Sequence, residues 1–307
     1  MNNITYEELA ETYLSSDARK LMAIHGKSFY FASKIFTRKR FEEVCKLYKL
    51  CRFIDDCADE LPTQESRRAL KNMTSDIDNR YRQTPFNQLV LEVEAFGVKR
   101  DQLKQLLYGT KFDVEQGEIH TWQDLFIYCY RVAGVVGLMM CPLIGVQNPK
   151  AYPHAIDLGL GMQMTNICRD ILEDKTNKRY YIPSNVFALK DSSLTDENSI
   201  NDLRNCLHLM LDKADDYYRS AYNGLSYIPF LSRLVILLAA EVYRHIGIKI
   251  RKLNYNVLSQ RVYLSKTEKF IVALKTLALL FKPFFWRSFK HKKQLHSSIR
   301  KLPGTHS

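Results

Sequence analysis

The sequence is poor in glycine and proline, with 12 and 9 among its 307 residues. Turn-rich β architectures need these residues at short intervals, so their scarcity argues against a sandwich or barrel and favours long helices. An alternating pattern of useful strand length is also missing. Apolar residues spaced three and four apart can instead be followed through most of the chain. We therefore predict an all-α protein.

The chain also lacks features of secreted, zinc-binding and nucleotide-binding proteins. Its seven cysteines are odd in number, form no CxxC pair and mostly lie in apolar runs, which favours a reducing compartment such as the cytoplasm. We find no His/Cys cluster typical of zinc and no glycine-rich nucleotide loop. The start, MNNITYEELAETYLSS, has no signal-peptide layout.

Long apolar runs are missing as well. The two most apolar stretches, 234–242 and 270–281, are interrupted by Glu241 and Lys275 and fall short of the ~20 residues that a spanning helix needs. We therefore expect a soluble or peripheral protein. Ten helices are predicted, at 6–24, 38–59, 64–82, 86–93, 100–116, 122–143, 151–173, 200–222, 229–255 and 266–289. The intervening breaks are of loop length, which indicates a single domain.

Positive charge is concentrated at the C-terminus. The net charge is +12, and the segment from Lys266 onward has ten Lys/Arg and one Glu, a net of +9. We interpret residues 1–282 as the helical domain and 283–307 as a basic, aromatic-containing tail, flexible or in peripheral contact with the inner face of a membrane. The alternative for the end of the chain is a last core helix followed by a disordered basic end. Nucleic-acid binding is not expected, because the charge is terminal and no binding motif occurs.

Two pairs of aspartates stand out, each pair four residues apart: Asp55 and Asp59 in CRFIDDCADE, and Asp170 and Asp174 in NICRDILED. This spacing puts both carboxylates on one helical face, where two like charges repel each other. Magnesium takes carboxylate oxygens together with substrate phosphates. Two such helices facing each other would hold magnesium-bridged diphosphates.

A single pair of this kind is usually a solvated helix face. Here each pair lies in an otherwise apolar helix and follows an arginine, Arg52 or Arg169. An arginine beside carboxylates can be a structural ion pair, but it also suits phosphate recognition. The repeated arrangement favours function over solvation.

Several ordered motifs resemble the squalene/phytoene synthase family, from about residue 24 to 269. They are HGKSFYFASKIF, LYKLCRFIDDCAD, YCYRVAGVVGLMM, GMQMTNICRDILEDKTNKRYYIP and AAEVYRHIGIKI. Within the family, the third and fifth look most like bacterial phytoene synthases. The resemblance implies a single all-helical domain, of the isoprenoid synthase type, around a central cavity.

The resemblance also implies roles for particular residues. It implies magnesium ligands at Asp55, Asp59, Asn166, Asp170 and Asp174. It implies binding of the substrate's diphosphate end or prenyl chain by Ser28, Phe29, Arg52, Ala133, Gly137, Arg169 and Arg179. It implies a position facing the reacting carbons for Gln163, and cation-tolerant aromatic walls from Tyr48, Tyr128 and Tyr243. Small residues and tyrosines at helical spacing can equally be simple packing.

The implied reaction joins two geranylgeranyl diphosphates head to head, through prephytoene diphosphate, to phytoene. Magnesium is the expected cofactor, with manganese as a substitute, and no NADPH is expected. The alternatives that remain are squalene or dehydrosqualene synthesis from two farnesyl diphosphates, and a non-catalytic helical scaffold.

Overall fold

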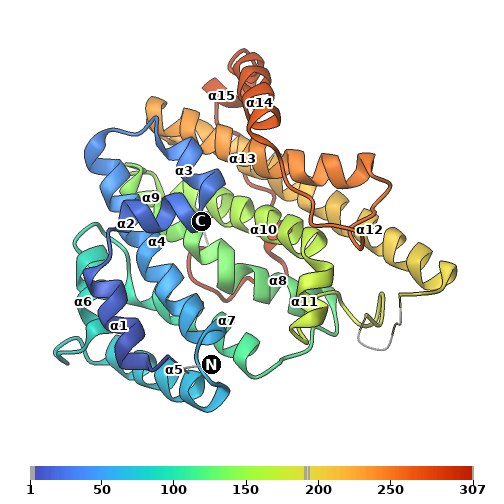
Figure 1. Cartoon of the computed structure of the whole chain (residues 1–307). Helices are drawn as coiled ribbons and strands as arrows, with labels where there is room; N and C mark the ends of the chain where they lie inside the picture. Colours follow the sequence, from blue (N-terminus) through green and yellow to red (C-terminus); the bar gives the residue numbers. More distant parts are fainter. Residues whose placement is uncertain (1–3, 190–191, 193, 306–307) are drawn as a thin grey trace.

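The computed structural model of the chain describes residues 4–189, 192 and 194–305. Helices make up the fold in Figure 1, and an isolated parallel bridge joins Glu118 to Tyr180. The α-helices are α1 (Tyr6–Ser15), α2 (Ala18–His25), α3 (Lys27–Ser33), α4 (Arg38–Asp59), α5 (Thr63–Asp78), α6 (Pro85–Glu94), α7 (Arg100–Val114), α8 (Trp122–Cys129), α9 (Val135–Leu143), α10 (Tyr152–Arg169), α11 (Ile171–Thr176), α12 (Glu197–Asn223), α13 (Phe230–Lys252), α14 (Lys266–Leu279) and α15 (Pro283–Trp286). Shorter turns are the π-helical η1 (Tyr130–Gly134) and the 3-10 turns η2 (Pro149–Ala151), η3 (Leu225–Tyr227) and η4 (Lys293–His296). The predicted all-α class is confirmed.

Two central helices carry the aspartate motifs. α10 packs against α8, α9, α12 and α13 and is buried along most of its length, as expected for a helix that is apolar on nearly all sides. α4 packs against α1, α2, α5, α6, α7 and α9. Each motif therefore lies at or just beyond the C-terminal end of a central helix.

Three of the predicted helices are each divided in two. Asp17 caps α2 by accepting hydrogen bonds from the backbone N–H groups of Arg19 and Lys20, which ends the predicted helix 6–24 early. The predicted helix 151–173 breaks at Asp170, and the predicted helix 266–289 breaks before Pro283, which cannot continue a helix. α3, within the HGKSFYFASKIF block, was not among the predicted helices.

The predicted helix 122–143 is present with a π-helical turn, η1, between α8 and α9. The stretch Trp122–Leu143 is long and apolar enough to cross a membrane by length and composition, which differs from the expectation based on two other runs. Half of it is buried in the fold, and it packs against α7 and α10. These contacts make it a core helix of the domain.

The C-terminal segment is packed onto the domain in the described part of the chain, which differs from the expected flexible tail. Phe285 and Ile299 are buried. The Tyr130 hydroxyl donates to the Pro303 carbonyl at 2.7 Å. Two histidines of this segment reach the buried carboxylate of Asp157 on α10. The reason is that the segment carries apolar and hydrogen-bonding side chains between its cations. A domain boundary at residue 282 and membrane contact by the tail stay predictions.

Candidate active site

The two aspartate motifs face each other across one polar cavity. Asp55 and Asp59 come from the last turns of α4, whereas Asp170 and Asp174 come from the junction of α10 and α11. The backbone N–H of Asp174 donates to the Asp170 carbonyl at 2.8 Å, so a helical turn continues through the break. The sequence-based expectation that two carboxylate pairs meet is therefore realised in the geometry.

Several carboxylates are crowded into this partly buried cavity. Burial raises the pKa of Asp55 to about 7, with a further contribution from Asp59. Burial also raises the pKa of Asp174 to about 8, with a further contribution from Asp170. Desolvation and like charges both disfavour the ionised form, and a bound cation would reverse both effects.

Arginines surround the carboxylates. Nη2 of Arg179 lies 2.5 Å from Oδ1 of Asp59, an ion pair that links the loop after α11 to α4. Burial works against the charge of Arg179, but this pair outweighs it and raises the pKa of the guanidinium. Arg169 makes a two-pronged contact with Asp170, at 2.8 and 2.5 Å. These guanidinium groups can exchange a carboxylate for a diphosphate, since both present paired oxygens.

Arg52 and Arg261 depart from the sequence-based expectation in different ways. Arg52 lines the cavity, but its charged partner is Asp56, at 2.5 Å, rather than a predicted metal ligand. Arg261 was not predicted, yet its Nε lies 2.9 Å from Asp170. It follows α13 in a loop outside the quoted motifs, so no spacing signal indicated it.

The residues present fit a divalent cation. The side-chain oxygen of Asn166 is buried, lines the cavity and has no hydrogen-bond partner among the described residues. An amide oxygen without a donor is costly when buried, and it is a ligand type that hard cations accept. Asp55 and Asp174 line the same cavity, so the donors available there are oxygens, which suit Mg²⁺ or Mn²⁺ better than zinc.

Two residues that line the polar cavity, Asp113 and Tyr181, were not identified from the sequence. The Tyr181 hydroxyl donates to Asp113 on α7 at 2.7 Å, and the Tyr128 hydroxyl donates to the same carboxylate at 3.3 Å. The rings of Tyr128 and Tyr181 stack with centroids 4.7 Å apart. Burial raises the pKa of Asp113 to about 6. Tyr181 lies in the quoted RYYIP motif and could have been found there, whereas Asp113 has no partner carboxylate at helical spacing.

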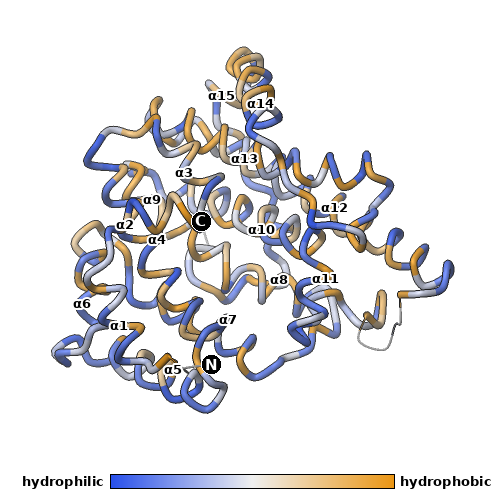
Figure 2. The backbone as a smooth tube through the Cα atoms, in the orientation of Figure 1, coloured by the Kyte–Doolittle hydropathy of each residue, from blue (hydrophilic) through white to orange (hydrophobic). Residues whose placement is uncertain are grey.

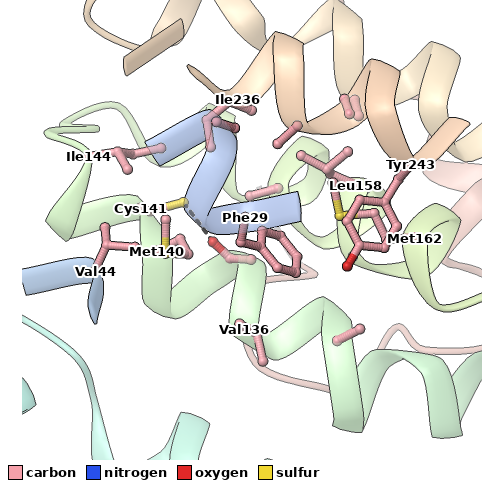
Figure 3. Close-up of a pocket in the computed structure, with 18 of the residues that line it drawn as sticks. Phe29, Val44, Val136, Met140, Cys141, Ile144, Leu158, Met162, Ile236 and Tyr243 are labelled. Carbon is pink, nitrogen blue, oxygen red and sulfur yellow. Dashed lines mark hydrogen bonds between the residues drawn. The ribbon is translucent and has the colours of Figure 1, made fainter. Parts of the chain in front are cut away.

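An apolar pocket of about 350 Å³ adjoins the polar cavity. Figure 3 shows side chains from α3, α4, α9, α10 and α13 lining it, among them Phe29, Met140, Leu158 and Tyr243. Its lining shares residues with the polar cavity, namely Asp55, Val132, Gln163 and Asn166. A charged head group and a long hydrocarbon chain can thus be held in adjoining spaces.

Most of the remaining predicted residues line the apolar pocket. Phe29 and Tyr243 line the apolar pocket with ring centroids 5.1 Å apart, and Tyr48 lies there too. Gln163 lies where the spaces meet, one turn before Asn166. The remaining pocket positions are Ala133 and Gly137. Ser28 is in α3, and its side chain lies outside the described part of the structure.

Comparisons with known proteins agree with this geometry. The family model described as "Squalene/phytoene synthase" matches residues 22–268. The chain is 33% identical to phytoene synthase of Rhodobacter capsulatus over 261 residues, 82% of this chain and 77% of that protein. It is 34% identical to phytoene synthase of Pseudescherichia vulneris over 280 residues, 85% of this chain and 90% of that protein.

Solved structures give the same fold. A dehydrosqualene synthase crystallised with a ligand superposes with a TM-score of 0.76 at 24% identity, covering 90% of this chain and 97% of that one. A squalene synthase from Alicyclobacillus acidocaldarius superposes with a TM-score of 0.67 at 20% identity, covering 82% and 96%. With two facing carboxylate motifs, an adjoining apolar pocket and a family match over most of its length, the chain belongs to the squalene/phytoene synthase family.

Proposed function

We propose that the protein is a phytoene synthase, which condenses two geranylgeranyl diphosphates head to head through prephytoene diphosphate. The observation that carries this proposal is the junction of the doubly acidic cavity with the apolar pocket. The names of the bacterial relatives at 33–34% identity favour phytoene over squalene or dehydrosqualene as the product. Synthesis from farnesyl diphosphate remains the second candidate.

Residues of this chain would divide the work as follows. Mg²⁺, held by Asp55, Asp59, Asn166, Asp170 and Asp174, would supply charge stabilisation for the departing diphosphate. Arg179 and Arg169 would exchange their carboxylate contacts for diphosphate oxygens. The rings of Phe29 and Tyr243 would exclude water from the cationic carbons and face them with π-electron density.

We assign proton removal to a group that lines the polar cavity. Loss of diphosphate leaves an allylic cation, the double bond of the second substrate attacks it, and a proton is lost as the cyclopropane closes. The Asp113 carboxylate, with two tyrosine hydroxyls donating to it, could receive that proton through Tyr128, and released diphosphate is the other acceptor.

The test is a product assay with Mg²⁺ and either geranylgeranyl or farnesyl diphosphate, with and without NADPH, followed by mass analysis of the hydrocarbon. We expect a C40 product that does not depend on NADPH. Asp170→Asn should abolish it with helicity retained, whereas Asp101→Asn, an exposed aspartate on α7, should not. A C30 product would move the assignment to the second candidate. Absence of any hydrocarbon from folded protein would contradict the enzyme assignment.

The cellular location is also a proposal. We propose the cytoplasm, with peripheral contact at the inner face of the membrane. All seven cysteines are free thiols, which supports a reducing compartment.

A further inference from the structure

α14 carries two apolar stripes, of which one packs on the domain. Val272 and Thr276 are buried on the side that contacts α13. The second stripe faces outward, with residues four, three and four apart along the chain, as neighbours on one helix face are. Its members on α14 and their exposed fractions are Phe270 (60%), Leu274 (52%) and Leu277 (54%), and Phe281 (88%) in the turn just after the helix continues the spacing. Figure 2 shows α14 as a largely hydrophobic segment that projects from the body of the molecule.

Neighbouring elements add further exposed apolar side chains. Trp286 of α15 is 60% exposed, and its ring stacks on Phe230 at the start of α13 with centroids 6.2 Å apart. Leu231 follows Phe230 and is 47% exposed. We call these residues the outer apolar face: Phe230, Leu231, Phe270, Leu274, Leu277, Phe281 and Trp286. So many large apolar side chains on adjoining elements are unusual for a monomer and indicate an interaction surface.

The charge around this face is positive. Glu268 is the last acidic residue of the chain, and Lys249 pairs with it at 2.7 Å. Lys275, Lys282 and Arg287 are exposed within or beside the face. A second copy of this chain would present the same cations and be repelled. An anionic lipid surface has the complementary charge and accepts apolar side chains.

The outer apolar face covers the wall of the substrate pocket. The side of α13 that carries Ile236 and Tyr243 lines the pocket, while α14 packs on the same helix from outside. Ile228 lines the pocket two residues before Phe230. One helix therefore separates the hydrocarbon-lined pocket from the exposed face.

We propose that the outer apolar face docks on an anionic lipid bilayer and places the apolar pocket beside the lipid phase. The choice of a lipid partner rests in part on the proposed function, because a long hydrocarbon product partitions into a bilayer. Of the tail 283–307, the outer apolar face keeps only α15, and it adds α14 and the start of α13. From Arg287 onward the described chain runs back over the domain towards Asp157 and Tyr130.

The test is flotation of the full chain with vesicles of phosphatidylcholine alone or mixed with phosphatidylglycerol. We expect the protein to bind the mixed vesicles and the binding to weaken as salt is added. Binding to vesicles of phosphatidylcholine alone should be weaker. The variant Leu274→Gln/Leu277→Gln/Phe281→Gln should lower the partition coefficient by roughly tenfold or more, because three apolar side chains that would enter the bilayer are lost.

The matched control replaces three apolar residues of similar exposure elsewhere, Tyr81→Gln/Leu91→Gln/Leu209→Gln, at 88, 44 and 48%. It should float like the unaltered protein. Equal flotation of both variants would overturn the proposal, as would failure of the unaltered protein to bind anionic vesicles. A dimer in solution that the α14 variant disrupts would assign the face to a second copy instead. Flotation needs no substrate, so its outcome is separable from that of the product assay.

Discussion

At the scale of single residues, Asp157 shows how the C-terminal segment is held. It is fully buried on α10 and accepts hydrogen bonds from Nε2 of His291 and His296, at 2.8 and 2.7 Å. Histidine and aspartate are common metal ligands, and the ligand atoms of these three side chains lie close to one another. The two N–O distances are those of hydrogen bonds, however, and zinc bonds of about 2 Å in a tetrahedral site would hold the ligand atoms further apart.

Asp157→Asn should therefore destabilise the fold in a pH-dependent way. Burial alone would raise the pKa of Asp157, but the two imidazole hydrogen bonds outweigh it and hold the pKa below the usual 3.8. A depressed pKa contributes stability that is complete above the unfolded value and is lost as pH falls through the folded one. We expect a loss of about 1.5–3 kcal/mol near pH 7 that shrinks below about pH 4, measured by urea unfolding.

The control for that measurement is Asp212→Asn. Asp212 lies 2.9 Å from Arg251 and 3.6 Å from His208, and its own side chain is 54% exposed. An exposed pair of this kind contributes at most about 1 kcal/mol. Equal losses for the two variants, or a loss at Asp157 that does not change with pH, would count against a stabilising role for the hydrogen bonds from His291 and His296 to Asp157.

At the scale of elements, α9 and α10 lie unusually close. A Cβ added to Gly137 would lie 2.2 Å from the backbone oxygen of Ala155, so alanine there would force the helices apart. We expect Gly137→Ala to lower the free energy of unfolding by about 1–3 kcal/mol and to impair product formation, since Gly137 also lines the pocket. In Gly247→Ala on α13, the added Cβ would lie 3.2 Å from the flexible end of Leu211 and 3.9 Å from Thr165, so the change should be neutral or stabilising. A stable Gly137→Ala protein would show that this close approach is not needed.

Helix positions could be predicted from the sequence wherever periodicity and breakers agree. The bounds of α4, 38–59, were predicted as the structure has them, because apolar spacing runs without interruption up to the motif. The break at Asp170 could not be predicted, since Ile171 and Leu172 continue the apolar pattern beyond it. α3 is seven residues long and too short for a clear period.

The site could be predicted only where its residues repeat at helical spacing. The two aspartate pairs were found this way, and Asn166 followed from the resemblance. Asp113 contributes a single carboxylate from α7, and its partners Tyr128 and Tyr181 are 15 and 68 residues away. The packing of His296 on Asp157 joins residues 139 apart. Contacts of this kind depend on how helices assemble, which local pattern does not encode.

At the scale of the whole molecule, the acidic cavity joins the α4–α7 half to the α10–α11 half, so cation binding should couple to global stability. The pKa values of Asp55 and Asp174, about 7 and 8, lie above the usual 3.8 of an unfolded chain. The folded state therefore binds more protons than the unfolded state between about pH 4 and pH 8. Without metal, stability falls as pH rises through that window.

Magnesium should reverse this trend, because it competes with protons for the same carboxylates. Each pH unit below the pKa of one such group weakens metal binding about tenfold. We expect the rise in melting temperature from Mg²⁺ relative to EDTA to be clearly larger at pH 8 than at pH 6. Asp55→Asn/Asp174→Asn should remove most of the rise and its dependence on pH, and Asp78→Asn/Asp212→Asn should not. A rise that is equal at both pH values would mean that the cation binds elsewhere, and the two halves of the molecule would then be joined by packing and arginine pairs alone.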